Sequence, residues 1–455
     1  MEPGGEVAGH GVAFRDAARF WIKLGFINFG GPTGQIAIMH EEIVHRRRWV
    51  GEGRFLHALN YCMLLPGPEA QQLAIYVGWL LHRAKGGLVA GIAFVLPSFF
   101  LLLALSWVYA VYGDVAWIAG VFSGLAAAVV GIIVVATIRI GSTALANPLM
   151  VAVAGAAFIA IFLLHVPFPL VVIGAVALGL VGDRVRPDLF EVGVERELEE
   201  HEQAAIRDDA EAGVHTRPNI RRSIFVLVVG LAVWFLPLLA VAWWRGTGDT
   251  LTEQAWFFSR ASLITFGGAY AVLSYINQAA VLQYGWLLPG QMVVGLGLAE
   301  STPGPLIMVV EFVGFVGAYR NPGDLDPVVA GALGALVVVW ATFVPCFLWI
   351  FLGAPYIERL RGNRRLGAAL QTVTAVVVGV IASLALTFAF TTLFDRVRAV
   401  DLVRGPVPIP VVSSVDPFAV AVAVAAFVAM RRFHVGVVPV VLAAGFAGLV
   451  VEGLL

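Results

Sequence analysis

Four short segments interrupt long apolar stretches of the sequence with glycine, proline and neutral polar residues. They read FGGPTGQ (29–35), LPGPEAQQ (65–72), FGGAYA (266–271) and STPGPLI (301–307). Glycine and proline lower helix stability, but proline is well tolerated in the first turn, so we expect half-helices to begin at these segments. The free N–H groups at a helix start, with the positive end of the helix dipole, bind anions. The segments therefore predict an anion site.

Neutral hydrogen-bond donors accompany the glycine and proline residues of these segments. Neutral donors and backbone amides suit a compact oxyanion that must be released again. The predicted substrate-binding residues in the segments are Gly30, Gly31, Pro32, Thr33, Gln35, Pro66, Gly67, Pro68, Gln71, Gln72, Gly267, Gly268, Ser301, Thr302, Pro303, Gly304 and Pro305. The alternative is that glycine and proline only permit close packing and kinks, as in many membrane helices. The recurrence of the segments as two matching pairs favours the site.

Two cations precede the Gly-Gly segments at matching distances. Lys23 precedes Gly30, and Arg260 precedes Gly267. Charged side chains inside a membrane are costly and usually functional, so Lys23 and Arg260 are also predicted to bind the substrate. The alternative is that both side chains extend to lipid headgroups. Arg139 is interpreted as a loop anchor.

Three carboxylic acids lie in or near the interrupted segments. Glu69 follows the first Pro-Gly-Pro, Glu300 precedes Ser301, and Glu311 lies a short distance further along the chain. Because ionisable groups at membrane depth are usually functional, these three residues are the candidates for proton coupling. The alternative for each is a structural partner for arginine or lysine. The pair EE (41–42), beside HRRRW (45–49), is interpreted as an ion-pair cluster at the membrane surface.

The elements that must position these residues are membrane helices. Of the 455 residues, 60% are hydrophobic and 13% are charged, with a mean hydropathy of +0.88, whereas soluble domains carry about 25% charged residues. The composition predicts an all-α polytopic membrane protein. A spanning helix needs about 20 apolar residues, and the candidate spans are 86–112, 115–138, 148–164, 168–181, 223–244, 328–352, 366–394, 417–430 and 435–450.

Several other classes of protein are disfavoured. The formal net charge of −1 and the lack of a dense basic tail give no indication of nucleic-acid binding. The sequence has no HExxH, GxSxG or Walker motif and no Cys/His cluster, so we expect neither an enzyme nor a cofactor or metal site. Cys62 and Cys346 are expected to be buried small side chains without a disulfide. The first residues do not match the pattern of a cleaved signal peptide.

The chain is predicted to be an internal duplication. Glycine, proline and aromatic residues recur in the same order 237, then 248, then 269 positions later. The matched pairs include Phe29 and Phe266, Trp49 and Trp286, Pro66 and Pro303, Pro97 and Pro345, and His165 and His434. The predicted units are an N-terminal transporter repeat (12–183), a cytoplasmic charged linker with one connecting helix (184–248), and a C-terminal transporter repeat (249–455).

Basic loops predict that the two repeats have opposite orientations in the membrane. The loops at 45–49, 82–85, 358–365 and 431–432 are basic, whereas several counterparts are uncharged or mixed. Cytoplasmic loops carry the excess of lysine and arginine, so the cytoplasmic side alternates between the copies, as in inverted-repeat transporters. Loops 45–49 and 82–85 share a side only if the segment between them dips into the membrane and returns at Pro-Gly-Pro. We therefore expect broken or re-entrant helices.

The order of these motifs resembles the chromate ion transporter family. The resemblance rests on FGGPTGQIAIMHEEIVHRRRWV (29–50), LLPGPEAQQLAIYVGW (64–79), VLPSFF (95–100), FGGAYAVLSYI (266–276) and ESTPGPLIMVVEFVGF (300–315). It implies a long-chain, two-domain member in the inner membrane that exports chromate, with sulfate as a similar oxyanion, and confers chromate resistance. Many relatives have Ala-His where this chain has Thr33-Gly34. A passive oxyanion channel, a sulfate transporter and a homodimer remain open.

Overall fold

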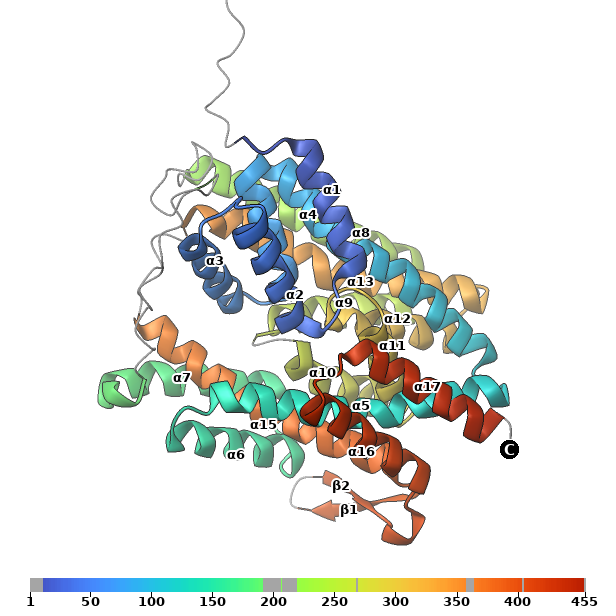
Figure 1. Cartoon of the computed structure of the whole chain (residues 1–455). Coiled ribbons are helices and arrows are strands. Elements are labelled where there is room, and N and C mark those ends of the chain that lie inside the picture. The colour runs from blue at the N-terminus through green and yellow to red at the C-terminus, as the bar shows by residue number, and fades with distance from the viewer. Residues whose placement is uncertain are drawn as a thin grey trace, which may run out of the picture.

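Helices make up nearly all of the secondary structure in the residues that the computed structural model describes, which are 11–190, 206, 219–266, 269–356, 364–402 and 405–453. They pack in two layers, with shorter helices between them (Figure 1). The first layer contains α1 (Phe14–Ile27), α4 (Glu69–Tyr112), α8 (Ile220–Arg245), α9 (Thr250–Leu263), α12 (Val309–Arg320) and α13 (Pro327–Gly353).

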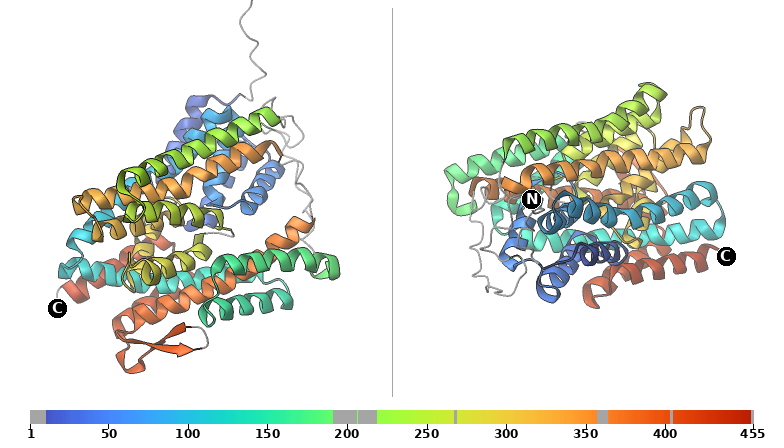
Figure 2. Two further views of the ribbon diagram at one scale, coloured as in Figure 1. Left: turned by 180° about the vertical axis from the view of Figure 1, so that it is seen from behind. Right: turned by 90° about the horizontal axis from the view of Figure 1, so that it is seen from above.

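The second layer and the connecting elements complete the structure, and Figure 2 shows them from behind and from above. The second layer contains α5 (Ala116–Ala144), α6 (Pro148–Phe162), α7 (Phe168–Val185), α15 (Arg364–Leu393), α16 (Pro417–Arg432), α17 (Val437–Gly453) and the hairpin of β1 (Val397–Leu402) and β2 (Gly405–Pro410). The helices between the layers are α2 (Gly31–His40), α3 (Glu52–Leu64), α10 (Ala269–Gln278) and α11 (Gln291–Ser301). Short helical turns are η1 (Glu41–Arg46), η2 (Pro187–Phe190), η4 (Ala279–Gln283), η5 (Leu306–Met308), η6 (Ala354–Tyr356) and η7 (Val412–Ser414).

The elements of the N-terminal part recur in the same order in the C-terminal part. Elements α1, α2, η1, α3, α5, α6 and α7 correspond to α9, α10, η4, α11, α15, α16 and α17. Both η1 and η4 are π-helical turns, and both His165 and His434 have positive φ angles, of 50° and 56°. Helix α8 has no counterpart and packs on α9 and α13. The rise of the offset from 248 to 269 coincides with the β-hairpin, which lies between α15 and α16.

Each repeat packs against the other in the second layer. Helix α5 packs against α16 and α17, whereas its counterpart α15 packs against α6 and α7. The contacts are reciprocal, because Gly131 meets the backbone of Ala423 and its counterpart Gly379 meets the backbone of Ala154. Helices α5 and α15 run in opposite directions across the layer (Figures 1 and 2). Opposite orientation of the repeats in a bilayer stays a prediction.

Helix α4 contains a sharp reversal. His82 and Arg83 have non-helical backbone angles, and the residues on either side fold back, so that Gly78 meets Gly86. Residues 69–81 and 84–112 are thus two antiparallel helices. In the other repeat α12 and α13 are also antiparallel, and Gly314 lies against the backbone carbonyl of Gly334.

The two basic loops of the N-terminal repeat lie near the same end of the molecule. The His82 ring nitrogen Nε2 is 2.9 Å from the backbone oxygen of Val12, just before α1. The guanidinium of Arg47 lies 4.8 Å from the centre of the Phe20 ring in α1. Both loops therefore flank the first part of α1, as the re-entrant arrangement predicts.

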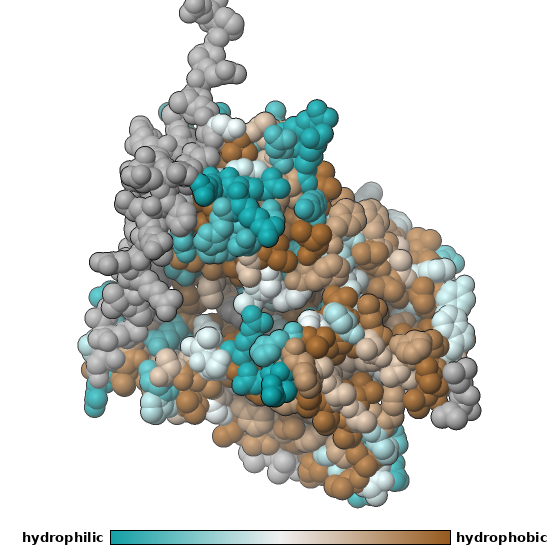
Figure 3. Space-filling model, in the orientation of Figure 1, coloured by the Kyte–Doolittle hydropathy of each residue, from teal (hydrophilic) through white to brown (hydrophobic). Residues whose placement is uncertain are grey.

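Among the residues that the structure describes, six helices are long and apolar enough to cross a membrane, which makes this a multi-pass membrane protein. They lie in Glu69–Tyr112, which includes the reversal at His82 and Arg83, and in Ala116–Ala144, Phe168–Val185, Ile220–Arg245, Pro327–Tyr356 and Gly367–Leu393. Helices α6 and α17 are apolar but shorter. Apolar residues cover most of the face over α5, α16 and α17, and hydrophilic residues gather near α2 and α3 (Figure 3). The largest fully buried side chains include Trp21, Trp79, Trp286 and Phe312, so much of the core lies in the first layer.

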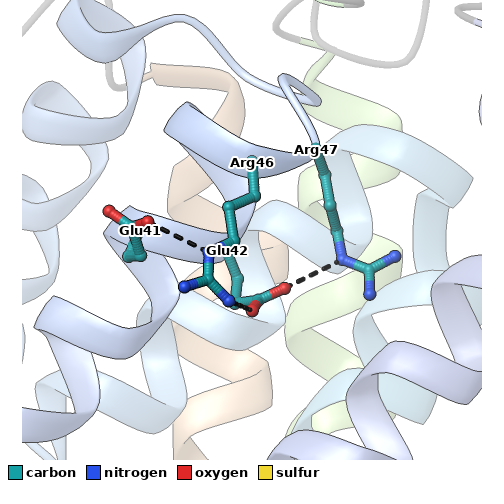
Figure 4. A network of polar contacts seen from close by, with 4 residues as sticks. All are labelled: Glu41, Glu42, Arg46 and Arg47. Carbon is teal, nitrogen blue, oxygen red and sulfur yellow. Dashed lines mark hydrogen bonds and ion pairs between the residues drawn. The ribbon is translucent and has the colours of Figure 1, made fainter.

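The predicted ion pairs are confirmed and involve η1 and the residue that follows it (Figure 4), whereas their place at a membrane surface stays a prediction. Arg46 contacts Glu41 and Glu42, each with a nitrogen–oxygen distance of 3.0 Å, and Arg47 contacts Glu42 at 3.3 Å. The Arg46 side chain is 65% exposed. Exposed ion pairs contribute about 0–1 kcal/mol, so the cluster orders this turn more than it stabilises the fold.

Candidate functional site

A cavity of about 370 Å³ lies between the two layers, where three of the interrupted segments and the residue before the fourth meet. This volume is in the range of small-molecule sites, roughly 300–1,000 Å³. Three of the segments contribute Gly30, Gly31, Pro32, Thr33, Leu65, Gly67, Glu69, Ala269 and Tyr270 to its wall, and Glu300, which directly precedes the fourth segment, also lines it. Gly267 and Gly268 lie outside the described residues. The rest of the wall comes mainly from α3, α5 and α15.

The three prolines that were expected to open half-helices do so. Pro32 lies in the first turn of α2, after Gly30, whose φ angle is 91°. Pro68 is the residue before α4, and Pro305 precedes η5, which continues into α12. The first N–H groups of a helix have no partner within the helix. Since the start of α2 lines the cavity, the positive end of its dipole faces the cavity.

Two reciprocal hydrogen bonds join the interrupted segments of the two repeats. The N–H of Gly67 donates to the backbone oxygen of Thr265, and the N–H of Gly304 donates to that of Asn28, each with a nitrogen–oxygen distance of 2.8 Å. Gly67 and Gly304 are counterparts, as are Asn28 and Thr265. Each Pro-Gly-Pro is thus held by the segment that precedes Gly-Gly in the other repeat.

The buried amide side chains hold the segments in place. Gln35 donates from Nε2 to the backbone oxygen of Gly304 at 2.5 Å. Gln72 donates to the backbone oxygen of Pro66 at 2.8 Å, and Gln71 lies 3.4 Å from that of Gly91. These three glutamines do not line the cavity in this structure, so their direct contact is with backbone carbonyls.

The hydroxyls of the fourth segment also point to their own backbone. Ser301 and Thr302 donate to the carbonyls of Leu298 and Ala299, with distances of 2.7 Å and 3.1 Å. The segment residues that pack beside the cavity without lining it are Gln35, Pro66, Pro68, Gln71, Gln72, Ser301, Thr302, Pro303, Gly304 and Pro305. Their place is around the site, and a role in binding stays a prediction.

The structure places a different arginine in the cavity from the one that was expected. Lys23 and Arg260 are exposed and do not line the cavity, and the Nε of Arg260 donates to the carbonyl of Trp256 at 3.2 Å. Arg139 lies within α5, not in a loop, so its interpretation as a loop anchor is wrong. It lines the cavity and is the one lysine or arginine among the described residues that do so.

Two of the three predicted carboxylic acids line the cavity. Glu69 and Glu300 are part of its wall, and the Tyr270 hydroxyl donates to Oε1 of Glu300 with an oxygen–oxygen distance of 2.5 Å. Glu311 is fully buried in α12, its two carboxyl oxygens have no hydrogen-bond partner among the described residues, and it does not line the cavity. None of the three forms an ion pair with another described residue. Tyr270 was not predicted as a site residue, although it lies within the third interrupted segment, FGGAYA (266–271).

The cavity can attract an anion and can also oppose one. The start of α2 and the Arg139 guanidinium favour negative charge, whereas ionised Glu69 and Glu300 would repel it. An anion in this cavity would therefore be repelled least when the two acids carry protons. Cys62, at the wall, and Cys346 are buried and unpaired, as expected. The described residues contain no group of three His, Cys, Asp or Glu side chains suited to a metal ion.

Comparison with known proteins finds a match to one family in both repeats. Residues 15–180 and 252–449 match the family model described as Chromate transporter. The chain is 30% identical over 437 residues to the chromate transport protein of Pseudomonas aeruginosa, covering 95% of this chain and 91% of that one. It is 28% identical over 401 residues to the chromate transport protein of Cupriavidus metallidurans, covering 84% of each. An uncharacterized transporter of Methanocaldococcus jannaschii is 22% identical over 372 residues, covering 81% of this chain and 83% of that one. No solved structure matches the chain.

Proposed function

Because this chain belongs to the chromate transporter family, we propose that it is a secondary transporter that exports chromate from the cytoplasm across the inner membrane. Export would confer resistance to chromate. The observation that carries the proposal is the cavity where the interrupted segments of both repeats meet beside Arg139. Relatives named as chromate transport proteins cover most of its length.

The chemistry of the cavity suits a tetrahedral dianion. A guanidinium can donate two parallel hydrogen bonds to an oxyanion, and the start of α2 supplies backbone donors. Chromate and sulfate have the same shape and charge, so sulfate is expected to compete. An inside-negative potential expels a dianion with about 2.3 kcal/mol per charge per 100 mV, which would drive export without a coupling ion.

We expect chromate uptake into inverted membrane vesicles that saturates with concentration and is inhibited by sulfate. Inverted vesicles expose the cytoplasmic face, so export appears as uptake. The measurement is the initial rate against chromate concentration, with vesicles lacking the protein as the control. A rate that rises linearly without saturation would support a passive channel. No chromate flux above the control would exclude chromate as the substrate.

Proton coupling is proposed for Glu300, which lines the cavity and accepts a hydrogen bond from Tyr270. We expect Glu300→Gln to retain chromate flux driven by a concentration gradient and to lose any response to an imposed pH gradient, because glutamine cannot exchange a proton. The measurement is vesicle flux with and without the pH gradient. Glu41→Gln, in the exposed ion-pair cluster, is the matched control. An equal response in wild type and Glu300→Gln would exclude Glu300 as the proton carrier.

A further inference from the structure

A second cavity, of about 380 Å³, lies along α15 and shares no wall residue with the first. Its wall comes from α6, α10, η4, α15 and the β-hairpin. Neither the sequence patterns nor the family assignment gives it a role. The internal duplication allows each wall residue of this cavity to be compared with its counterpart in the first cavity.

Corresponding faces of corresponding helices line the two cavities. In α5 and in α15 the lining residues pair with a constant spacing of 248 positions. The pairs are Val135 and Ser383, Ala136 and Leu384, Arg139 and Thr387, Ile140 and Phe388, and Thr143 and Thr391. Met430 and Ile161, 269 positions apart, form a further pair. The second cavity is therefore the counterpart of the first under the pseudo-symmetry of the fold.

The two cavities lie toward opposite ends of the spanning helices. The first lies at the C-terminal part of α5, close to the linker side, where the Asn147 side chain donates from Nδ2 to the backbone oxygen of Leu189 at 2.9 Å. The second lies at the C-terminal part of α15, where Val397 and Pro408 of the hairpin form part of its wall. Helices α5 and α15 are antiparallel and both can span a membrane. In a bilayer the two cavities would therefore lie toward opposite membrane faces.

The cavities differ in how far they reach. The first extends to the interrupted segments, at Gly30, Gly67 and Tyr270. Along α10 the second reaches Ser274 and Asn277 but none of the interrupted segments. The binding segments are thus reached from one end only in this structure, as expected for one state of an alternating-access carrier.

The cavities also differ in charge. Arg139, Glu69 and Glu300 line the first, whereas the described wall of the second contains no Asp, Glu, Lys or Arg. Thr387 stands where the first cavity has Arg139. The second wall offers neutral hydroxyl and amide groups, together with His165, whose buried Nδ1 has no hydrogen-bond partner in the part of the chain that the structure describes. A dianion would be held less tightly among neutral donors than beside a guanidinium.

We propose that the second cavity is the release chamber of the same pathway and opens on the membrane face opposite to the Arg139 cavity. Its ligand is a tetrahedral divalent oxyanion, held by neutral donors. This ligand class rests on the proposed function, but the location of the chamber does not. Weak binding by neutral donors would let the oxyanion leave the second chamber readily, and the electrochemical gradient would set the direction of net movement.

The test uses the matched threonines Thr143 and Thr391. Thr143→Cys and Thr391→Cys are made separately in a Cys62→Ala, Cys346→Ala background and treated with a small membrane-impermeant thiol reagent. Labelling is read by mass spectrometry in inverted and in right-side-out vesicles. We expect the cysteine at 143 to react at least tenfold faster in inverted vesicles and the cysteine at 391 at least tenfold faster in right-side-out vesicles. Reaction of both from the same side, or no reaction at 391 from either side, would overturn the proposal.

A second pair guards against a variant that fails to fold. Val135→Cys and Ser383→Cys occupy counterpart positions in the same cavities and should show the same opposite sidedness. Sulfate, which does not oxidise thiols, is the probe for occupancy and should slow labelling in both cavities. Opposite sidedness without sulfate protection would keep the two-sided arrangement and reject an oxyanion in the second cavity. Because labelling needs no transport, a failure of chromate flux is distinguishable from a failure of this proposal.

Discussion

Replacing Arg139 with glutamine is expected to raise the KM for chromate about 10- to 150-fold in inverted vesicles. Hydrogen bonds to charged groups contribute about 1.5–3 kcal/mol, and each 1.36 kcal/mol corresponds to about tenfold in affinity. Arg139 is the one lysine or arginine on the described wall of the first cavity, so no described neighbour there can replace its charge. The measurement is the initial rate of chromate uptake over a wide concentration range.

The controls for this variant separate charge from general damage. Arg184→Gln removes an exposed arginine at the end of α7, away from the cavity wall, and should leave the KM unchanged. Arg139→Lys keeps the charge but loses the planar pair of donors, so it should give an intermediate KM. An unchanged KM in Arg139→Gln, at normal membrane levels, would contradict a role for Arg139 in binding.

Gly67→Ala and Gly304→Ala are each expected to abolish most transport and to lower thermal stability. Their φ angles are 121° and 125°, a region that residues with a side chain rarely adopt. A Cβ at Gly67 would lie 2.8 Å from Sγ of Cys346, and one at Gly304 would lie 2.5 Å from Cβ of Ser98. Forcing a left-handed backbone costs about 1–2 kcal/mol, and overpacking adds roughly 1–3 kcal/mol. Thermal unfolding of detergent-solubilised protein and vesicle flux are the two measurements.

Matched glycines distinguish backbone strain from steric contact. Gly31 has a φ angle of 66° with no atom within 4 Å of an added Cβ, so Gly31→Ala should show the strain alone. Gly155 has neither feature, and Gly155→Ala should be close to wild type. Combining Gly304→Ala with Ser98→Gly should recover part of the lost stability. Wild-type stability and flux in both Gly67→Ala and Gly304→Ala would show that glycine is not required at these two positions.

The duplication and the interrupted segments could be predicted because they depend on glycine and proline, whose effects on the backbone are local. Proline fixes its own φ angle and glycine allows backbone angles that other residues avoid, so Pro32, Pro68 and Pro305 marked helix starts without any tertiary information. The hydrogen bonds from Gly67 and Gly304 to the other repeat could not be predicted, because nothing local specifies a partner more than 190 residues away.

The direction in which a side chain points was the harder problem. In a membrane protein the faces that meet lipid and the faces that meet the core are both apolar, so the pattern does not orient a helix. Lys23 shares an exposed face of α1 with Ile22 and Phe26, which the sequence could not distinguish from a buried face. Arg139 was assigned to a loop because a charged residue ended the apolar window, although α5 continues to Ala144. The sequence signal that was available is that Thr387, the counterpart of Arg139 at the offset of 248, lies inside the predicted span 366–394.

The reciprocal bonds between the repeats have a consequence for biosynthesis. The chain is made from its N-terminus, so the Asn28 carbonyl and the Gly67 N–H are inserted long before Gly304 and Thr265 leave the ribosome. Unpaired backbone groups are costly in a lipid environment, and each repeat's interrupted segments find these partners in the other copy. After insertion, the first repeat therefore lacks these hydrogen bonds until the second repeat has been synthesised and inserted. During that interval quality-control proteases can act on it.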